Sequence, residues 1–247
     1  MATKSGIEWT EQTWNPVTGC TKISDGCKHC YAKTFAERLQ KMGTKGYERG
    51  FQVALHPDRL AQPIARTKPT VYFVNSMSDL FHDQVPVEFI ERILETVKDT
   101  PQHRYQVLTK RPDSMAKFFE SRPVPDNVWL GVSVENRKHG VPRIGQLAGI
   151  KARIRFLSVE PLLEDVGQLD LSAIHWVIVG GESGPSARLM QPDWVRSIRD
   201  QCLKSKTAFF FKQWGSLGPD GQRRAKKKNG RSLDGVLWDE LPLEQHA

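Results

Sequence analysis

The feature that most constrains the fold is an alternation of short apolar segments, rich in β-branched and aromatic residues, with longer amphipathic segments. The short segments have strand length, and the longer ones repeat apolar residues at the three- and four-residue spacing of helices. This order predicts a parallel sheet with right-handed crossovers. Strands are predicted at 70–75, 104–109, 127–134, 153–159, 175–180 and 208–213, and helices within 87–100, 112–122, 136–147 and 192–204.

We therefore predict an α/β fold, a full or partial (β/α) barrel of about six parallel strands. The 247 residues fit a single domain spanning 1–247, since single barrels reach this length. Residues 7–13 could form a further short first strand, which would decide whether the barrel closes. A basic C-terminal extension is expected at about 216–247.

Three cysteines, Cys20, Cys27 and Cys30, lie in one loop with C-x6-C-x2-C spacing. Three thiolates can hold three irons of a cubic iron–sulfur cluster and leave the fourth iron open to a small molecule. A structural zinc site needs four closed ligands, and neither His29 nor the distant Cys202 is well placed to complete one. The spacing favours a cluster, and zinc remains the alternative. Cys202 lies in a predicted amphipathic helix and is expected to be buried.

The chain carries a formal net charge of +8, and much of the excess falls in the run at 223–231. Such a run suits phosphate backbones, although a solvated loop would have the same composition. No apolar run is long enough to span a bilayer, and the N-terminus lacks the apolar core of a signal peptide. With cysteines clustered rather than paired along the chain, we expect a reducing cytoplasm.

Polar side chains follow the end of each predicted strand. In βα barrels the active site is assembled at this carboxyl face, so the series predicts one shared pocket. The residues are Ser78, Asp79, Lys110, Arg111, Glu135, Asn136, Glu160, Glu182, Lys212 and Gln213.

With a three-cysteine loop, a following helix at 31–42 and repeated βα units, the chain resembles the radical S-adenosylmethionine superfamily. Within it, the chain resembles phage-type three-Cys-motif proteins. The likeness is carried by WNPVTGC, CKHCYA, NSMSDLFH, LTKRP, VSVEN, SVEPLL, GGESG and FKQWG. A more distant similarity is to spore photoproduct lyases, which repair DNA and place an Asp after the second strand and a Thr-Lys after the third. The loop departs from the common C-x3-C-x2-C spacing.

The resemblance implies a [4Fe–4S] cluster on Cys20, Cys27 and Cys30, with S-adenosylmethionine chelating the open iron. Reductive cleavage would give methionine and a 5′-deoxyadenosyl radical, with electrons from a flavodoxin- or ferredoxin-like donor. The cofactor then carries the chemistry and the protein holds it in register.

Individual residues receive cofactor roles from the same resemblance. Asp79 is expected to accept from the methionine amino group and Lys110 to pair with its carboxylate. The ribose hydroxyls are assigned to Ser133 and Glu135, the adenine to Tyr31 or His29, and Ser78 joins the cofactor-binding set. The superfamily role of a Gly-Gly-Glu motif is not transferred to Glu182, because GGESG follows a later strand.

The substrate is the least constrained part of the prediction. The basic run favours radical chemistry on a nucleic acid or nucleotide. The same chemistry on a small molecule or peptide is the first alternative. A nucleic-acid-binding protein with structural zinc and no catalysis is the second.

Overall fold

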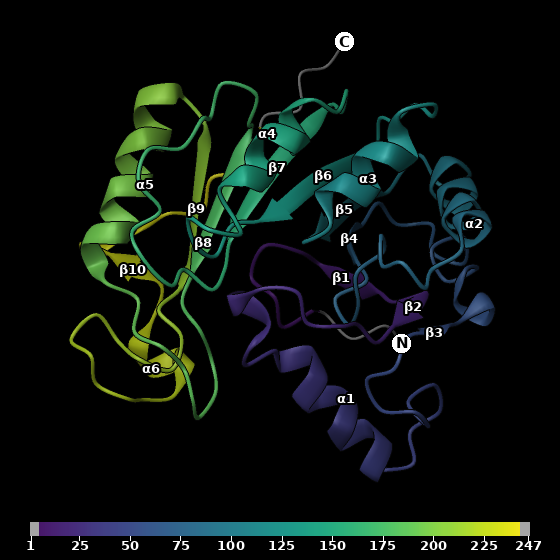
Figure 1. Cartoon of the computed structure of the whole chain (residues 1–247), viewed down its shortest axis with the longest axis horizontal. Coiled ribbons are helices and arrows are strands. Elements are labelled where there is room, and N and C mark those ends of the chain that lie inside the picture. The colour runs from purple at the N-terminus through teal and green to yellow at the C-terminus, as the bar shows by residue number, and fades with distance from the viewer. Residues whose placement is uncertain (1–4, 243–247) are drawn as a thin grey trace. The chain divides into compact units, whose positions relative to one another are not determined.

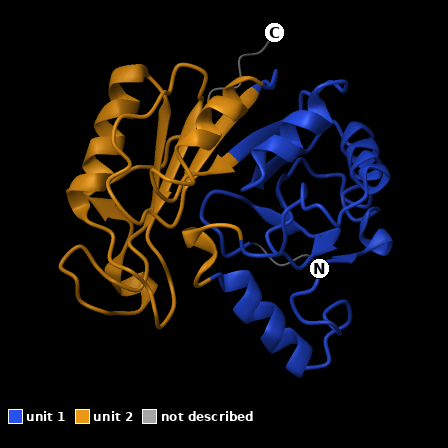
Figure 2. Cartoon of the chain, viewed as in Figure 1, with its two compact units in different colours: residues 1–22, 30–131, 150–153 blue, residues 23–29, 132–149, 154–247 orange. Residues whose placement is uncertain are grey.

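The computed structural model describes residues 5–242, so the last part of the predicted extension, 243–247, lies outside the described residues. The chain divides into two compact units (Figure 2). Unit 1 comprises the described residues of 1–22, 30–131 and 150–153, and unit 2 comprises those of 23–29, 132–149 and 154–247. The cysteine loop contributes to both units.

Unit 1 is built on parallel strands that alternate with helices (Figure 1). Strand β1 pairs in parallel with β4, and β4 pairs in parallel with β5. A small antiparallel ladder joins β2 to β3. The elements are β1 (Gln12–Trp14), β2 (Val17–Thr18), α1 (Tyr31–Lys41), β3 (Ala54–Leu55), η2 (Pro57–Arg59), β4 (Val71–Val74), α2 (Val87–Lys98), β5 (Arg104–Thr109) and α3 (Pro112–Phe119).

Aromatic side chains fill the core of unit 1. Trp14 and Tyr105 are fully buried, with ring centroids 5.6 Å apart. Tyr72 stacks on Tyr105 at the same centroid distance. Burial raises the pKa of the Tyr105 phenol, whose hydroxyl is satisfied by Thr100. Such large rings bury much apolar surface, and this core fixes the strands whose ends carry the candidate site.

Unit 2 continues the alternation of strand and helix. Strand β8 pairs in parallel with both β7 and β9. Strand β6 (Val128–Ser133) begins in unit 1 and ends in unit 2, and it is buried along its whole length. The other elements are η1 (Asp25–Cys27), α4 (Pro142–Ala148), β7 (Ile154–Val159), β8 (Trp176–Gly180), α5 (Pro192–Ser205), β9 (Ala208–Gln213), α6 (Lys226–Asn229), β10 (Ser232–Leu233) and β11 (Val236–Leu237).

The C-terminal residues of unit 2 are ordered on its sheet. Strands β10 and β11 form an antiparallel hairpin around Asp234 and Gly235, both with positive φ, as a tight two-residue turn requires. The Asp234 carboxylate pairs with Arg196 at 2.7 Å and Arg199 at 2.9 Å on α5. The predicted extension is thus attached to α5 at its hairpin.

The predicted α/β fold class is confirmed. The strand order is β1-β4-β5-β6-β7-β8-β9, seven strands in the described residues rather than about six. The order is linear, which corresponds to the partial form of the barrel. The extra strand is β1, which takes up only the end of the predicted 7–13 segment and one residue beyond it. The predicted single domain remains a prediction.

No helix within residues 5–242 combines the length and the apolar character needed to span a bilayer.

Candidate functional site

In unit 1, the segment Ser76–Asp79 directly after β4 holds both flanks of the cysteine loop. The Gly19 N–H donates to the Met77 carbonyl at 3.0 Å, and the Ser78 hydroxyl donates to the Val17 carbonyl at 3.0 Å. On the other flank, the Tyr31 hydroxyl donates to the Ser76 carbonyl at 2.5 Å. The predicted residues Ser78 and Tyr31 therefore meet through one short segment.

Asp79 is a buried acceptor that ties this segment to the end of β5. Its Oδ1 accepts from the Thr109 hydroxyl at 2.7 Å and from the Phe81 N–H at 3.1 Å. Its Oδ2 accepts from the Lys110 N–H at 3.0 Å and from Arg111 Nη1 at 3.3 Å. A carboxylate has about four lone-pair sites, so these four donors occupy them. Asp79 thus orients the residues that follow β5.

Arg111 reaches from the end of β5 to the first cysteine. Its Nη1 lies 3.6 Å from Cys20 Sγ, while Nη2 donates to the Thr21 carbonyl and hydroxyl at 3.3 and 2.9 Å. Burial alone would lower the pKa of Arg111, but Asp79 and Cys20 outweigh it and raise the pKa. The thiol of Cys20 therefore lies beside a permanent positive charge.

Cys30 is the N-cap residue of α1 and is half-buried against an apolar cluster of unit 1. The cluster consists of Ala32, Ala36, Tyr47 and Met77. Tyr31, one of the two residues predicted to lie at the adenine, is 58% exposed, and its hydroxyl is bonded to the Ser76 carbonyl.

In unit 2, Cys27 lies in the one-turn helix η1. Its N–H donates to the Ser24 carbonyl at 3.0 Å. The neighbouring Asp25 anchors this turn: its carboxylate accepts from Asn136 Nδ2 at 2.9 Å and its carbonyl from Arg188 Nη2 at 3.1 Å. Loops after β6 and β8 thus support the turn that carries the second cysteine.

Three carboxylates at the ends of successive strands of unit 2 each pair with a cation. Buried Glu135 pairs with Arg143 at 2.6 Å, Glu160 with Lys212 at 3.1 Å, and Glu182 with Arg188 at 2.6 Å. Charge-assisted hydrogen bonds of this kind are shorter and stronger than those between neutral groups. The polar strand ends of this unit are thus charge-paired groups, and the single shared pocket stays a prediction.

Glu135 and Ser133, predicted ribose ligands, are both buried. Arg143 binds the Ser133 carbonyl at 2.7 Å as well as the Glu135 carboxylate. A Cβ placed on Gly26 would lie only 3.1 Å from Glu135 Cγ, so the cysteine loop packs directly on this side chain. Glu135 therefore supports the cysteine loop, whether or not it also binds a ligand.

Glu182 shows how the pairing affects ionisation. Burial would raise the pKa of its carboxyl, but hydrogen bonds from Arg188 outweigh burial and lower it. The glycines before it pack against the protein itself: a Cβ on Gly181 would lie 2.0 Å from the Trp214 carbonyl oxygen. GGESG is therefore a packing motif in this structure.

The donor set fits an iron–sulfur cluster by its chemistry. Cys20, Cys27 and Cys30 are half-buried thiols that form no disulfide bond. Cys202 is fully buried in α5, as expected, and burial raises its pKa to about 12, so it is unsuited to be a ligand. No three His, Cys, Asp or Glu side chains within residues 5–242 are grouped closely enough to hold a metal ion. Cys20 and Cys30 belong to unit 1, and Cys27 belongs to unit 2.

The basic run is partly neutralised within unit 2. Arg224 pairs with Asp220 at 2.5 Å, and Arg231 pairs with Asp239. The side chains of Lys227 and Lys228 in α6 are exposed. The lysines are therefore the better candidates for contact with an anionic partner.

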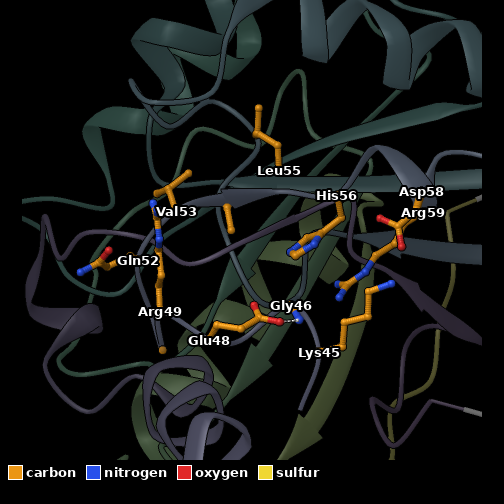
Figure 3. Close-up of a pocket in the computed structure, with 12 residues that line it drawn as sticks. Lys45, Gly46, Glu48, Arg49, Gln52, Val53, Leu55, His56, Asp58 and Arg59 are labelled. Atoms are coloured by element: carbon orange, nitrogen blue, oxygen red, sulfur yellow. Dashed lines mark hydrogen bonds between the residues drawn. The ribbon is translucent and has the colours of Figure 1, made fainter. Parts of the chain in front are cut away.

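Unit 1 also contains a cavity of about 520 Å³ formed by residues 45–59 (Figure 3). Lys45, Arg49 and Arg59 line it together with Glu48 and Asp58. The Glu48 carboxylate accepts from the Gly46 N–H at 2.8 Å, and this bond lowers its pKa. Charges of both signs line the cavity, so it selects no ligand class.

Several residues of the site had no predicted role. Arg111 was recognised as a strand-end residue, and its place in LTKRP beside Lys110 was the available signal. Arg143 and Arg188 carry no comparable signal, because their partners depend on the path of the loops after β6 and β8. Asn136 was recognised only as a strand-end amide.

Comparison with solved structures finds the same fold in spore photoproduct lyase. A cysteine-to-serine variant matches with a TM-score of 0.51 and 16% sequence identity over 83% of this chain. A tyrosine-to-phenylalanine variant matches with a TM-score of 0.51 and 15% identity. A double variant with bound AdoMet and dinucleoside spore photoproduct matches with a TM-score of 0.50 and 14% identity. At such identity the likeness shows the fold alone, a partial barrel of parallel strands and helices.

This chain covers 64% of the length of these lyase chains. No curated protein matches its sequence. The family model described as "Protein of unknown function (DUF5131)" matches residues 4–242, almost the whole chain. The protein therefore belongs to the DUF5131 family.

Proposed function

We propose that this protein is an iron–sulfur enzyme that reductively cleaves S-adenosylmethionine, with Cys20, Cys27 and Cys30 as cluster ligands. The observation that carries the proposal is the cysteine loop itself, which has three half-buried thiols in no disulfide bond. Both of its flanks are fixed in unit 1 to the segment after β4. The fold shared with the spore photoproduct lyase structures supports this assignment.

When bound and reduced, the cluster would supply one electron to the sulfonium, breaking its bond to C5′ and releasing methionine and a 5′-deoxyadenosyl radical that takes hydrogen from the substrate. The electron would come from a flavodoxin- or ferredoxin-like donor. An open iron with three thiolate ligands suits this chemistry. The protein then binds, orients and shields the reactants.

We assign the cofactor contacts to the residues after β4, β5 and β6. Lys110 would pair with the carboxylate of S-adenosylmethionine, and Asp79, through its bond to the Lys110 N–H, would orient that residue. To accept a hydrogen bond from the amino group of S-adenosylmethionine, Asp79 would have to give up one of its four present donors. Ser78, Ser133 and Glu135 remain proposed contacts to the cofactor, and the exposed ring of Tyr31 is the proposed adenine contact.

For the substrate we propose a nucleic acid or nucleotide. The exposed Lys227 and Lys228 offer charge for a phosphate backbone. Two of the similar lyase structures contain a dinucleoside spore photoproduct. A small molecule or peptide is the alternative substrate.

The test is anaerobic reconstitution with iron and sulfide, followed by S-adenosylmethionine and dithionite. We expect a brown protein that releases methionine and 5′-deoxyadenosine in equal amounts. A protein that binds zinc at the loop and releases no 5′-deoxyadenosine would instead be the non-catalytic nucleic-acid-binding alternative.

A further inference from the structure

Arg111 stands between a strand-end carboxylate and a loop cysteine, all within unit 1. Its side chain is only 12% exposed. One nitrogen, Nη1, lies 3.3 Å from Asp79 Oδ2 and 3.6 Å from Cys20 Sγ. The other, Nη2, bonds the Thr21 hydroxyl, which lies 2.9 Å from His82 Nε2. The side chain is therefore fixed at several points.

The contact with Cys20 is not a by-product of neutralising Asp79. Asp79 already accepts from Thr109, Phe81 and the Lys110 N–H. Three of the Arg111 contacts go to the cysteine and to the residue after it. The guanidinium thus makes more contacts with the start of the cysteine loop than with the Asp79 carboxylate.

We propose that Arg111 is a positioning residue that fixes Cys20 as a ligand and raises the reduction potential of the bound cluster. The inference rests on the proposed function. A donor and positive charge beside a ligand sulfur stabilise the more negative, reduced form of a cluster, and such contacts set cluster potentials. Arg111 would therefore make the electron easier to load.

The experiment measures the midpoint potential and iron content of the reconstituted protein and of Arg111→Gln and Arg111→Lys. Arg122→Gln is the matched control, because Arg122 belongs to the same unit and pairs with Glu91 at 2.8 Å on α2. For Arg111→Gln we expect a lower potential, with the reduced-to-oxidised ratio at fixed potential falling at least about tenfold, which is about 59 mV for one electron. The midpoint potential of Arg111→Lys should lie between those of Arg111→Gln and the wild type. The potential of the control should match that of the wild type.

The outcomes separate this inference from the proposed function. If the wild type takes up no cluster, both fail. If Arg111→Gln holds a full cluster at the wild-type potential, the inference alone fails. A variant that changes only the affinity for S-adenosylmethionine would place Arg111 on that ligand and overturn its role at Cys20. Loss of iron from Arg111→Gln with recovery in Arg111→Lys would support the positioning role.

Discussion

The Glu160 carboxylate occupies the space that a side chain at Gly180 would need. A Cβ there would lie 2.2 Å from Glu160 Oε1. The two residues lie at the ends of the neighbouring strands β7 and β8, and the same carboxylate pairs with Lys212 on β9 at 3.1 Å. The absence of a side chain at Gly180 is thus what allows this charge pair to form.

Gly180→Ala should therefore displace Glu160 and weaken its pairing with Lys212. We expect a loss of about 1–3 kcal/mol, the usual effect of overpacking. Urea unfolding measures it. Gly145→Ala is the control, because that glycine lies in α4 with no atom near its added Cβ, and the change should be neutral or stabilising. Equal stability of the two variants would contradict the packing argument.

Each loop cysteine should be needed for iron. Cys20→Ala, Cys27→Ala and Cys30→Ala should each lose the reconstituted cluster, because a three-ligand site cannot spare a thiolate. Cys202→Ala should keep its iron, since that thiol is sealed in α5, and should show only a lower Tm. Iron and sulfide analysis measures the difference. Full iron content in a loop variant would remove that cysteine from the ligand set.

Glu182 should make stability depend on acid pH. Burial would raise its pKa, but Arg188 outweighs burial, and the folded pKa lies below the ordinary 4.5. The stabilisation is therefore complete above that value and is lost as the pH falls through the folded pKa. Arg188→Gln should flatten this part of the profile, measured by urea unfolding across the acid range. If the stability profiles of the wild type and Arg188→Gln stay parallel across the acid range, the Glu182–Arg188 pair does not control this pH dependence.

The lysines of α6 should carry most of any phosphate contact. Lys227→Ser with Lys228→Ser should reduce the slope of log affinity against log salt by about 0.9 per contact on duplex DNA. Arg224→Ser with Arg231→Ser is the charge-matched control and should change the slope less, because Asp220 and Asp239 already pair with these arginines. Fluorescence anisotropy with labelled DNA measures both. If neither double variant alters the slope, this segment takes no part in nucleic-acid binding.

Gly19 should tolerate no side chain. Its φ is +82°, and a Cβ would lie 2.0 Å from the Gln52 carbonyl oxygen. Gly19→Ala should cost more than the roughly 1–3 kcal/mol of a strained backbone alone. Gly43→Ala separates the backbone strain from the steric clash, because Gly43 also has a positive φ but has open space around it. Thermal unfolding of both measures the excess, and equal losses would exclude the steric contribution.

The strands could be predicted well because buried parallel strands are continuous apolar runs. Strands β5 and β9 coincide with the predicted 104–109 and 208–213. The helix predicted at 136–147 begins only at Pro142, since the Asn136 side chain accepts from the His139 N–H at 2.8 Å and forms a turn. Local side-chain bonds of this kind compete with helix formation.

The candidate site was only partly predictable. Strand-end residues such as Asp79 and Glu135 follow from the rule that parallel strands present their carboxyl ends together. Their partners do not: Arg143 and Arg188 reach these carboxylates through loops whose course depends on packing. The roles of the predicted cofactor residues stay predictions until a ligand is measured.

The C-terminal residues cover the exposed side of β9, the last strand in the sheet order. The Phe211 N–H donates to the Trp238 carbonyl at 2.9 Å, and the Phe209 N–H donates to the Glu240 carboxylate at 2.9 Å. A chain shortened before Val236 would leave these amides open to another molecule's backbone. Chains shortened before Val236 should therefore self-associate through the open edge of β9. Chains that end after Glu240 should stay monomeric.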